Sequence, residues 1–169
     1  MAEAAQRIAE ITLDERTVIR RNPEIERERA AAIADLMHDN HFSPASGLPG
    51  PFHVHLAARE GRLAMQVQSV AAANGETIVL PLKPFGRIIK DYFLVCESYS
   101  KALRGANLGQ VEAIDMGRRG LHDEGAELLQ ERLAGKVAVD RATARRLFTL
   151  ICVLHLKTSA QGLGPHPRA

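Results

Sequence analysis

Apolar and polar side chains alternate in four segments of the first half of the chain. The two longest of these segments are joined by Glu60-Gly61, and Asn74-Gly75 precedes the last one, so both junctions have residues typical of tight turns. Alternation with a period of two indicates a half-buried strand, and short turns between such strands predict an antiparallel β-meander. The predicted strands cover 7–13, 52–59, 62–69 and 77–82.

Apolar residues recur at steps of three and four in four other segments, which is the spacing of one face of an α-helix. Asn22, Asn107 and Asp140 stand where the first, third and last of these helices begin, and each can cap a helix through its side-chain oxygen. The mixture of Glu and Arg at the start of the first helix is expected to face solvent. The predicted helices cover 23–39, 84–104, 108–134 and 141–157.

Three of these helices have features that bear on their packing. A continuous apolar stripe along 84–104 predicts that this is the central helix, packed on the sheet. The last helix is apolar on nearly all sides from Leu147 onward, so it is either wholly buried or half of an oligomer interface. Three glycines predict a kink or a split in the helix 108–134, namely Gly117, Gly120 and Gly125.

Strands followed by a run of helices indicate an α+β fold rather than a doubly wound parallel sheet. We expect a small antiparallel sheet of three to four strands, a β-meander, packed against about four helices. The chain of 169 residues has the usual length of one domain. A single globular domain is predicted over residues 1–157, and residues 158–169, which contain Gly, Pro and Ser, are predicted to form a disordered C-terminal tail.

The charge balance argues against two classes of partner. The 22 Lys and Arg residues nearly match the 20 Asp and Glu residues, and a formal net charge of +2 predicts binding neither to nucleic acid nor to a membrane surface. We find no apolar run of signal-peptide length near the N-terminus, and the longest apolar stretch, 147–156, is too short to span a bilayer. Two cysteines predict no disulfide framework, so we expect a cytoplasmic protein.

Three long strings in the sequence are distinctive: KPFGRIIKDYFLVCESY, VEAIDMGRRGLHDEG and TARRLFTLICVLH. They closely resemble a bacterial family known only as uncharacterised protein family 0262. The resemblance covers the chain from about Arg7 to His155 and leaves the predicted tail outside. It implies no activity, substrate or cofactor, because none is established for the family.

The strongest candidate for chemistry is the segment 112–124 of the third predicted helix. Residues three, four and seven apart share a helix face, so Asp115, Arg118, Arg119 and His122 are expected to point to the same side. Arginine presents forked donors to a phosphate or carboxylate, and histidine can exchange a proton near neutral pH. One hypothesis is an anion held by Arg118 or Arg119, with His122 as acid or base and Asp115 orienting it.

A purely structural interpretation of the same residues stays open. Asp115 with Arg119, and Arg119 with Asp123, have the spacing of ordinary ion pairs on a helix face. Gly117 and Gly120 can serve tight helix packing as well as the close approach of a ligand.

Arg141, Arg145 and Arg146 lie in the first turns of the last helix, where the helix dipole disfavours cations. We therefore expect a compensating group, which is either a bound anion or a carboxylate of the preceding helix. If the two helices dock, these arginines and the Asp115–His122 cluster form one site. The carboxylates available for this are Asp123, Glu124, Glu127 and Glu131.

For the other residues with metal-binding or nucleophilic side chains we favour a structural role. Four histidines have no spacing typical of a metal site, so we predict neither a metal nor a cofactor. Both cysteines fall in apolar stretches, and cysteines buried in such surroundings are inert core residues. The residues concerned are His38, His41, His53, His55, Cys96 and Cys152.

The sequence contains no P-loop, dinucleotide fingerprint, nucleophile elbow or HExxH string. The absence of these motifs favours the first hypothesis, a non-enzymatic regulatory or protein-interaction module. Such a module acts on another protein or as a homo-oligomer. The second hypothesis is a module that binds a small anionic, phosphorylated ligand through the Asp115–His122 cluster. The third is an enzyme that uses His122 as general acid or base. The ligand-binding candidates are Asp115, Arg118, Arg119, His122, Arg145 and Arg146.

Overall fold

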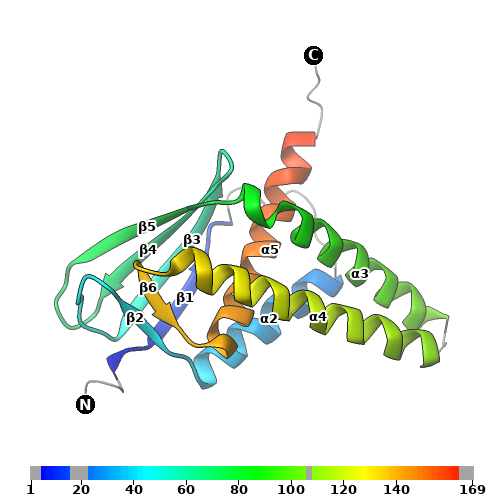
Figure 1. The fold of residues 1–169 in the computed structure, drawn as a ribbon, viewed down its shortest axis with the longest axis horizontal. Helices are drawn as coiled ribbons and strands as arrows, with labels where there is room; N and C mark the ends of the chain where they lie inside the picture. The colour runs from blue at the N-terminus through cyan, green and yellow to red at the C-terminus, as the bar shows by residue number, and fades with distance from the viewer. Residues whose placement is uncertain (1–4, 16–22, 106–107, 164–169) are drawn as a thin grey trace.

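The computed structural model describes residues 5–15, 23–105 and 108–163, with the side chains of the last helix described as far as Leu154. Figure 1 shows a sheet on one side of the molecule and the helices on the other. The α+β fold predicted from the sequence is confirmed. In chain order the elements are β1 (Ile8–Leu13), α2 (Pro23–His38), β2 (Phe42–Pro44), β3 (Phe52–Arg59), β4 (Arg62–Ser69), β5 (Gly75–Pro81), the 3-10 turn η1 (Lys83–Phe85), α3 (Gly86–Arg104), α4 (Leu108–Leu133), β6 (Val137–Val139) and α5 (Arg141–Leu163).

The main sheet has four strands in the order β1-β3-β4-β5. Strands β3, β4 and β5 form the predicted antiparallel meander. Strand β1, however, runs parallel to β3, with Ile11 opposite Val54, so the sheet is mixed rather than wholly antiparallel. The physical reason is the connection, because the long crossover through α2 brings the chain back in its original direction.

Side-chain alternation orients the meander as its sequence predicts. On β3, Phe52, Val54 and Leu56 are buried against the helices, whereas His53 faces outward. The β3–β4 turn has positive φ angles at Glu60 (52°) and Gly61 (75°). Two consecutive left-handed residues match the right-handed twist of the flanking strands, which explains the tight turn at this place.

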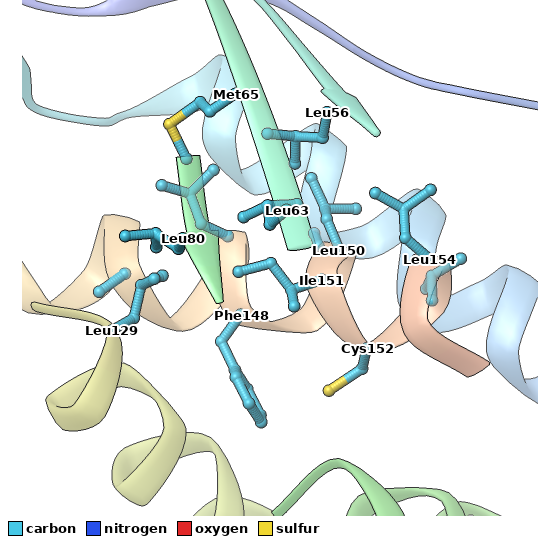
Figure 2. Packing of buried hydrophobic residues seen from close by; sticks show 14 of the residues in the cluster. Leu56, Leu63, Met65, Leu80, Leu129, Phe148, Leu150, Ile151, Cys152 and Leu154 are labelled. Carbon is cyan, nitrogen blue, oxygen red and sulfur yellow. The ribbon is translucent and has the colours of Figure 1, made fainter. Parts of the chain in front are cut away.

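Helix α5 lies at the centre of the structure, between the sheet and the other helices (Figure 1). It packs against β3 and against α2, α3 and α4. Every side chain from Leu147 to Leu154 is at most 4% exposed. Figure 2 shows Leu150 and Ile151 among sheet side chains such as Leu63. The apolar run of α5 is therefore buried within the fold itself, so it does not favour an oligomer interface.

The prediction that the helix over 84–104 is the central one, packed on the sheet, is wrong. Helix α3 packs chiefly against α4, and α5 occupies the place next to the sheet. Along the apolar stripe of α3, Ile89, Tyr92 and Cys96 are buried, but Leu103 is 48% exposed. The stripe leaves the core at this end because the α3–α4 pair extends beyond α5 (Figure 1).

Of the predicted kink or split in α4, the split is wrong, since α4 is one continuous helix. A glycine costs about 1 kcal/mol in a helix interior, which tertiary packing readily offsets. Of the three glycines that predicted it, only Gly125 is tightly packed, because a Cβ there would lie 2.6 Å from the ring of Phe148 on α5. Added Cβ atoms at Gly117 and Gly120 would meet nothing within 4 Å, so these two glycines do not serve helix packing.

The ends of the predicted helices are only partly tested. Asp140 caps α5 as predicted, since its Oδ1 accepts a hydrogen bond from the Thr143 backbone N–H at 2.8 Å. Asn22 and Asn107 lie outside the described residues. The last turns of α5 overlap the predicted tail, whose remainder, 164–169, also lies outside them, so this domain boundary stays a prediction. In the part of the chain that the structure describes, no helix is both long and apolar enough to cross a membrane.

Candidate functional site

A pocket of about 600 Å³ lies where α2, α4 and the first turns of α5 meet. Arginine side chains from two helices line it, with fewer carboxylates facing them. The arginines of the two helices were expected to form one site if the helices dock. The helices do dock, and the pocket brings the two groups of arginines together. The arginines are Arg118 and Arg119 of α4 with Arg141, Arg145 and Arg146 of α5, and the lining carboxylates are Glu28 and Asp35 of α2.

Glu28 of α2 lies at the bottom of this region and connects three helices. Its carboxylate accepts a hydrogen bond from the hydroxyl of Tyr92 on α3 at 2.6 Å and pairs with the guanidinium of Arg118 on α4. Its side chain is only 11% exposed. The Nε2 atom of His122 is 4.0 Å from the same carboxylate. Glu28 was missed by the sequence analysis because its Glu- and Arg-rich segment has the composition of a solvated face.

Arg118 is the cationic centre of this buried network. Its two terminal nitrogens are taken by Glu28 and by Asp115, and its guanidinium stacks over the ring of Tyr99 at 5.1 Å. Its Nε atom is buried without a hydrogen-bond partner among the described residues. Arg118 therefore links α2, α3 and α4.

Asp115 completes the network on the surface of α4. It pairs with Arg118 at 2.5 Å and with Arg119 at 3.0 Å. The hydrogen bond from Arg118 holds the pKa of the Asp115 carboxyl below its usual range. The predicted Asp115–Arg119 ion pair is confirmed, whereas Asp123 pairs with Arg145 of α5 at 3.2 Å instead of with Arg119.

His122 lies between the buried network and the pocket. Its ring is 5.2 Å from the ring of Tyr92, and its Nε2 atom is 3.3 Å from the Thr149 hydroxyl. That hydroxyl is also 3.1 Å from the Arg145 carbonyl, so it can donate there and accept from His122 when the imidazole proton is on Nε2. Asp115 does not orient His122 as the sequence hypothesis required, because both its partners are arginines.

Burial lowers the pKa of His122 to about 4, and the charges of Arg118 and Arg145 act in the same direction. The imidazole is therefore neutral at pH 7. A general base works best when its pKa lies near the working pH, so His122 is a weak base for neutral-pH catalysis. Its contacts suit a hydrogen-bonding residue in the wall of the pocket.

The arginines at the start of α5 differ in how fully they are paired. Arg145 pairs with Asp123, which confirms one of the predicted compensating carboxylates. Arg146 Nε is 3.6 Å from Asp35 of α2. Arg141 makes no side-chain hydrogen bond or ion pair within the described part of the chain. Of the other proposed carboxylates, Glu124 pairs with Arg87 of α3.

The cysteines and the other histidines considered in the sequence analysis do not line this pocket. His53 and His55 are on the outer face of β3, where His53 Nε2 is 3.6 Å from Glu10 and His55 Nδ1 is 2.7 Å from the Thr12 hydroxyl. Among the residues that the structure describes, no group of three or more His, Cys, Asp or Glu side chains is arranged to hold a metal ion.

Both cysteines are buried in the core. Burial raises the pKa of the Cys96 thiol to about 12 and that of the Cys152 thiol well above its usual value. A thiol without accessible thiolate is a poor nucleophile, which agrees with the core interpretation.

The fold and the pocket together define an α+β protein with an arginine-lined pocket between three helices. The chain belongs to the uncharacterised protein family UPF0262, whose family model matches residues 5–157. It is 54% identical over 150 residues to a UPF0262 protein of Rhodospirillum rubrum, covering 89% of this chain and 92% of that relative. It is 52% identical over 158 residues to a UPF0262 protein of Nitrobacter winogradskyi, covering 94% of this chain and 95% of that relative. No solved structure matches the chain. The family description assigns no function.

Proposed function

We propose that this protein is a cytoplasmic binding module for a small anionic, phosphorylated ligand, held in the pocket between α2, α4 and α5. The observation that carries the proposal is the set of five arginines that line this one pocket against two lining carboxylates. A volume of about 600 Å³ is within the usual range for small-molecule sites. Arginine forks match the oxygens of a phosphate, which is why such clusters favour phosphate over a neutral ligand.

Three of the five arginines have donors available to a ligand. Arg141 has no side-chain partner among the described residues, and the Arg119 side chain is 71% exposed. Arg146 uses Nη1 for a hydrogen bond to the Ala142 carbonyl and Nε for a long contact with Asp35, which leaves Nη2 for a ligand. The N-terminus of α5 adds the positive end of its dipole at the same place. Like charges at a helix N-terminus repel one another and the dipole, and a bound anion relieves that repulsion.

The test is a calorimetric titration of the purified full-length chain with inorganic phosphate at constant ionic strength. Arg141→Gln and Arg146→Gln each remove a charged donor, and a hydrogen bond to a charged group is worth enough to weaken binding by about tenfold or more. Arg132→Gln is the matched control, because Arg132 is an exposed arginine of α4 that does not line the pocket.

The proposal expects saturable phosphate binding that both pocket variants weaken and the control leaves unchanged. No phosphate binding, or equal weakening in all three variants, contradicts it. Arg118→Gln is unsuitable as the primary variant, because it breaks the buried pair with Glu28 and perturbs the fold as well as the pocket.

A protein-interaction function is the second candidate. It is favoured by apolar side chains that the α3–α4 pair exposes, of which Leu108 is 78% and Met116 is 71% exposed. Sedimentation of the wild-type chain and of Leu108→Lys tests for self-association directly. A concentration-dependent dimer that the variant abolishes supports this candidate, whereas a monomer at all concentrations argues against self-association.

A further inference from the structure

The pocket has two walls of opposite charge. The arginines come from α4 and α5, whereas α2 contributes Glu28 and Asp35. These two carboxylates are seven residues apart and therefore lie on the same face of α2, two turns from each other. Ala31 and Ala32 lie between them on that face and also line the pocket. Their small side chains leave room for a short molecule that lies along α2.

The two carboxylates differ in how fully they are used by the protein. Glu28 is nearly buried and engaged by Tyr92 and Arg118. The Asp35 side chain is 58% exposed, and its contact with Arg146 Nε is 3.6 Å long. That distance exceeds a good hydrogen bond, and an exposed pair of this kind contributes little to stability. Asp35 is therefore an acceptor that a ligand can engage at small cost.

We propose that the ligand is a phosphomonoester whose short organic part carries hydroxyl or ammonium groups. Its phosphate lies against the arginines of α5, and its donor groups meet the carboxylate of Asp35 on α2. This inference rests on the proposed function, because it specifies what the same pocket selects.

Charge and desolvation support this choice over two simpler anions. A polyphosphate that fills the pocket brings negative charge against the carboxylates of Glu28 and Asp35, which is repulsive. A phosphate with a purely apolar tail covers Asp35 and displaces water from its carboxylate without giving it a hydrogen bond. Desolvating a carboxylate without a new hydrogen bond is costly, and the 3.6 Å contact with Arg146 does not replace that bond. A donor-bearing tail avoids both penalties.

The test is a set of calorimetric titrations with O-phosphoethanolamine, glycerol 3-phosphate, propyl phosphate and inorganic phosphate. Propyl phosphate has the size and shape of O-phosphoethanolamine with a methyl group in place of the ammonium group. Each ligand is titrated into the wild-type chain, into Asp35→Asn and into Asp39→Asn. Asp39 is exposed, follows the end of α2 and does not line the pocket, so this third protein controls for the change in net charge.

The wild-type chain is expected to bind at least one donor-bearing ligand about tenfold more tightly than propyl phosphate. This preference should disappear in Asp35→Asn and persist in Asp39→Asn. Preference for O-phosphoethanolamine alone identifies an amine, and preference for both donor-bearing ligands identifies a broader class that includes polyols.

Two results overturn the inference and can be told apart. If inorganic phosphate binds but propyl phosphate binds as tightly as the donor-bearing ligands, or if Asp35→Asn keeps the preference, the inference fails and the proposed function stands. If none of the four compounds binds, the proposed function fails and the inference fails with it.

Discussion

Replacing Glu28 by alanine should destabilise the protein more than any other single change to a charged side chain around the pocket. The substitution leaves the buried Tyr92 hydroxyl without its acceptor and the half-buried Arg118 with Asp115 as its remaining carboxylate. Removing one partner of a buried ion pair typically costs about 3–5 kcal/mol. Because Glu28 borders a pocket that water can enter, we expect the lower end, about 3 kcal/mol.

For a domain of this length, each kcal/mol lowers the melting temperature by about 2–4 °C, so Glu28→Ala should melt roughly 6–12 °C below the wild-type chain. The melting temperature of Glu28→Gln should lie between those of the wild-type chain and of Glu28→Ala, because its amide oxygen still accepts a hydrogen bond from Tyr92. Glu112→Ala is the control, since Glu112 is exposed on α4 and lies outside the network. Thermal denaturation followed by circular dichroism measures all three. A Glu28→Ala protein that melts within about 2 °C of the control would refute the assignment of Glu28 as the structural centre of the network.

Three further predictions concern the core and its ionisable groups. Gly125→Ala should destabilise the protein by about 1–3 kcal/mol, because its Cβ would lie 2.6 Å from the Phe148 ring. Gly117→Ala should stabilise it by up to about 1 kcal/mol, because the added Cβ meets nothing within 4 Å and alanine favours the helix. Urea denaturation measures the sign of both changes. The pKa of His122 is about 4 in the folded protein against 6.5 in the unfolded chain. Between these values the unfolded chain takes up a proton that the folded protein does not, so the free energy of unfolding is highest above pH 6.5 and falls as the pH drops toward 4. His122→Gln should therefore flatten the pH dependence of stability in that window, and an unchanged slope would count against the buried neutral imidazole. Cys96 and Cys152 should react with a thiol reagent only after unfolding, so rapid modification of the native chain would contradict their burial.

The local features of the fold could be predicted from the sequence, because they depend on neighbouring residues. Alternation identified the meander, and Asp140 identified the start of α5. The parallel pairing of β1 with β3 could not be predicted in the same way, since it joins Ile11 to Val54 across a long crossover. Helix α3 has one apolar stripe and α5 is apolar on nearly all sides from Leu147 onward, but neither pattern specifies which element the helix packs on. The central position of α5 therefore became visible only in the structure.

In the candidate site, too, local features could be predicted from the sequence, whereas features that depend on helix packing could not. The dipole argument predicted a compensating group for the arginines at the start of α5, either a carboxylate or a bound anion, and Asp123 is such a group for Arg145. Glu28 lies in a segment with the composition of a solvated face, and Asp35 lies on a helix whose packing partners the local pattern does not specify, so neither could be predicted. Only the docking of α2 against α5 turns one side of that helix toward the pocket. The structure also separates the predicted cluster into two parts, with Arg118 inside the network and Arg119 largely exposed beside the pocket.

The central claim is that an anion binds among the arginines of α4 and α5, and NMR of the arginine side chains tests it most directly. Inorganic phosphate is titrated into the labelled chain while the Nε–H resonance of each arginine is followed. Saturable shifts are expected at Arg141, Arg146 and Arg119, with no comparable change at Arg132, an exposed arginine outside the pocket lining. Shifts that do not saturate, or that spread equally over Arg132 and the pocket arginines, would contradict it.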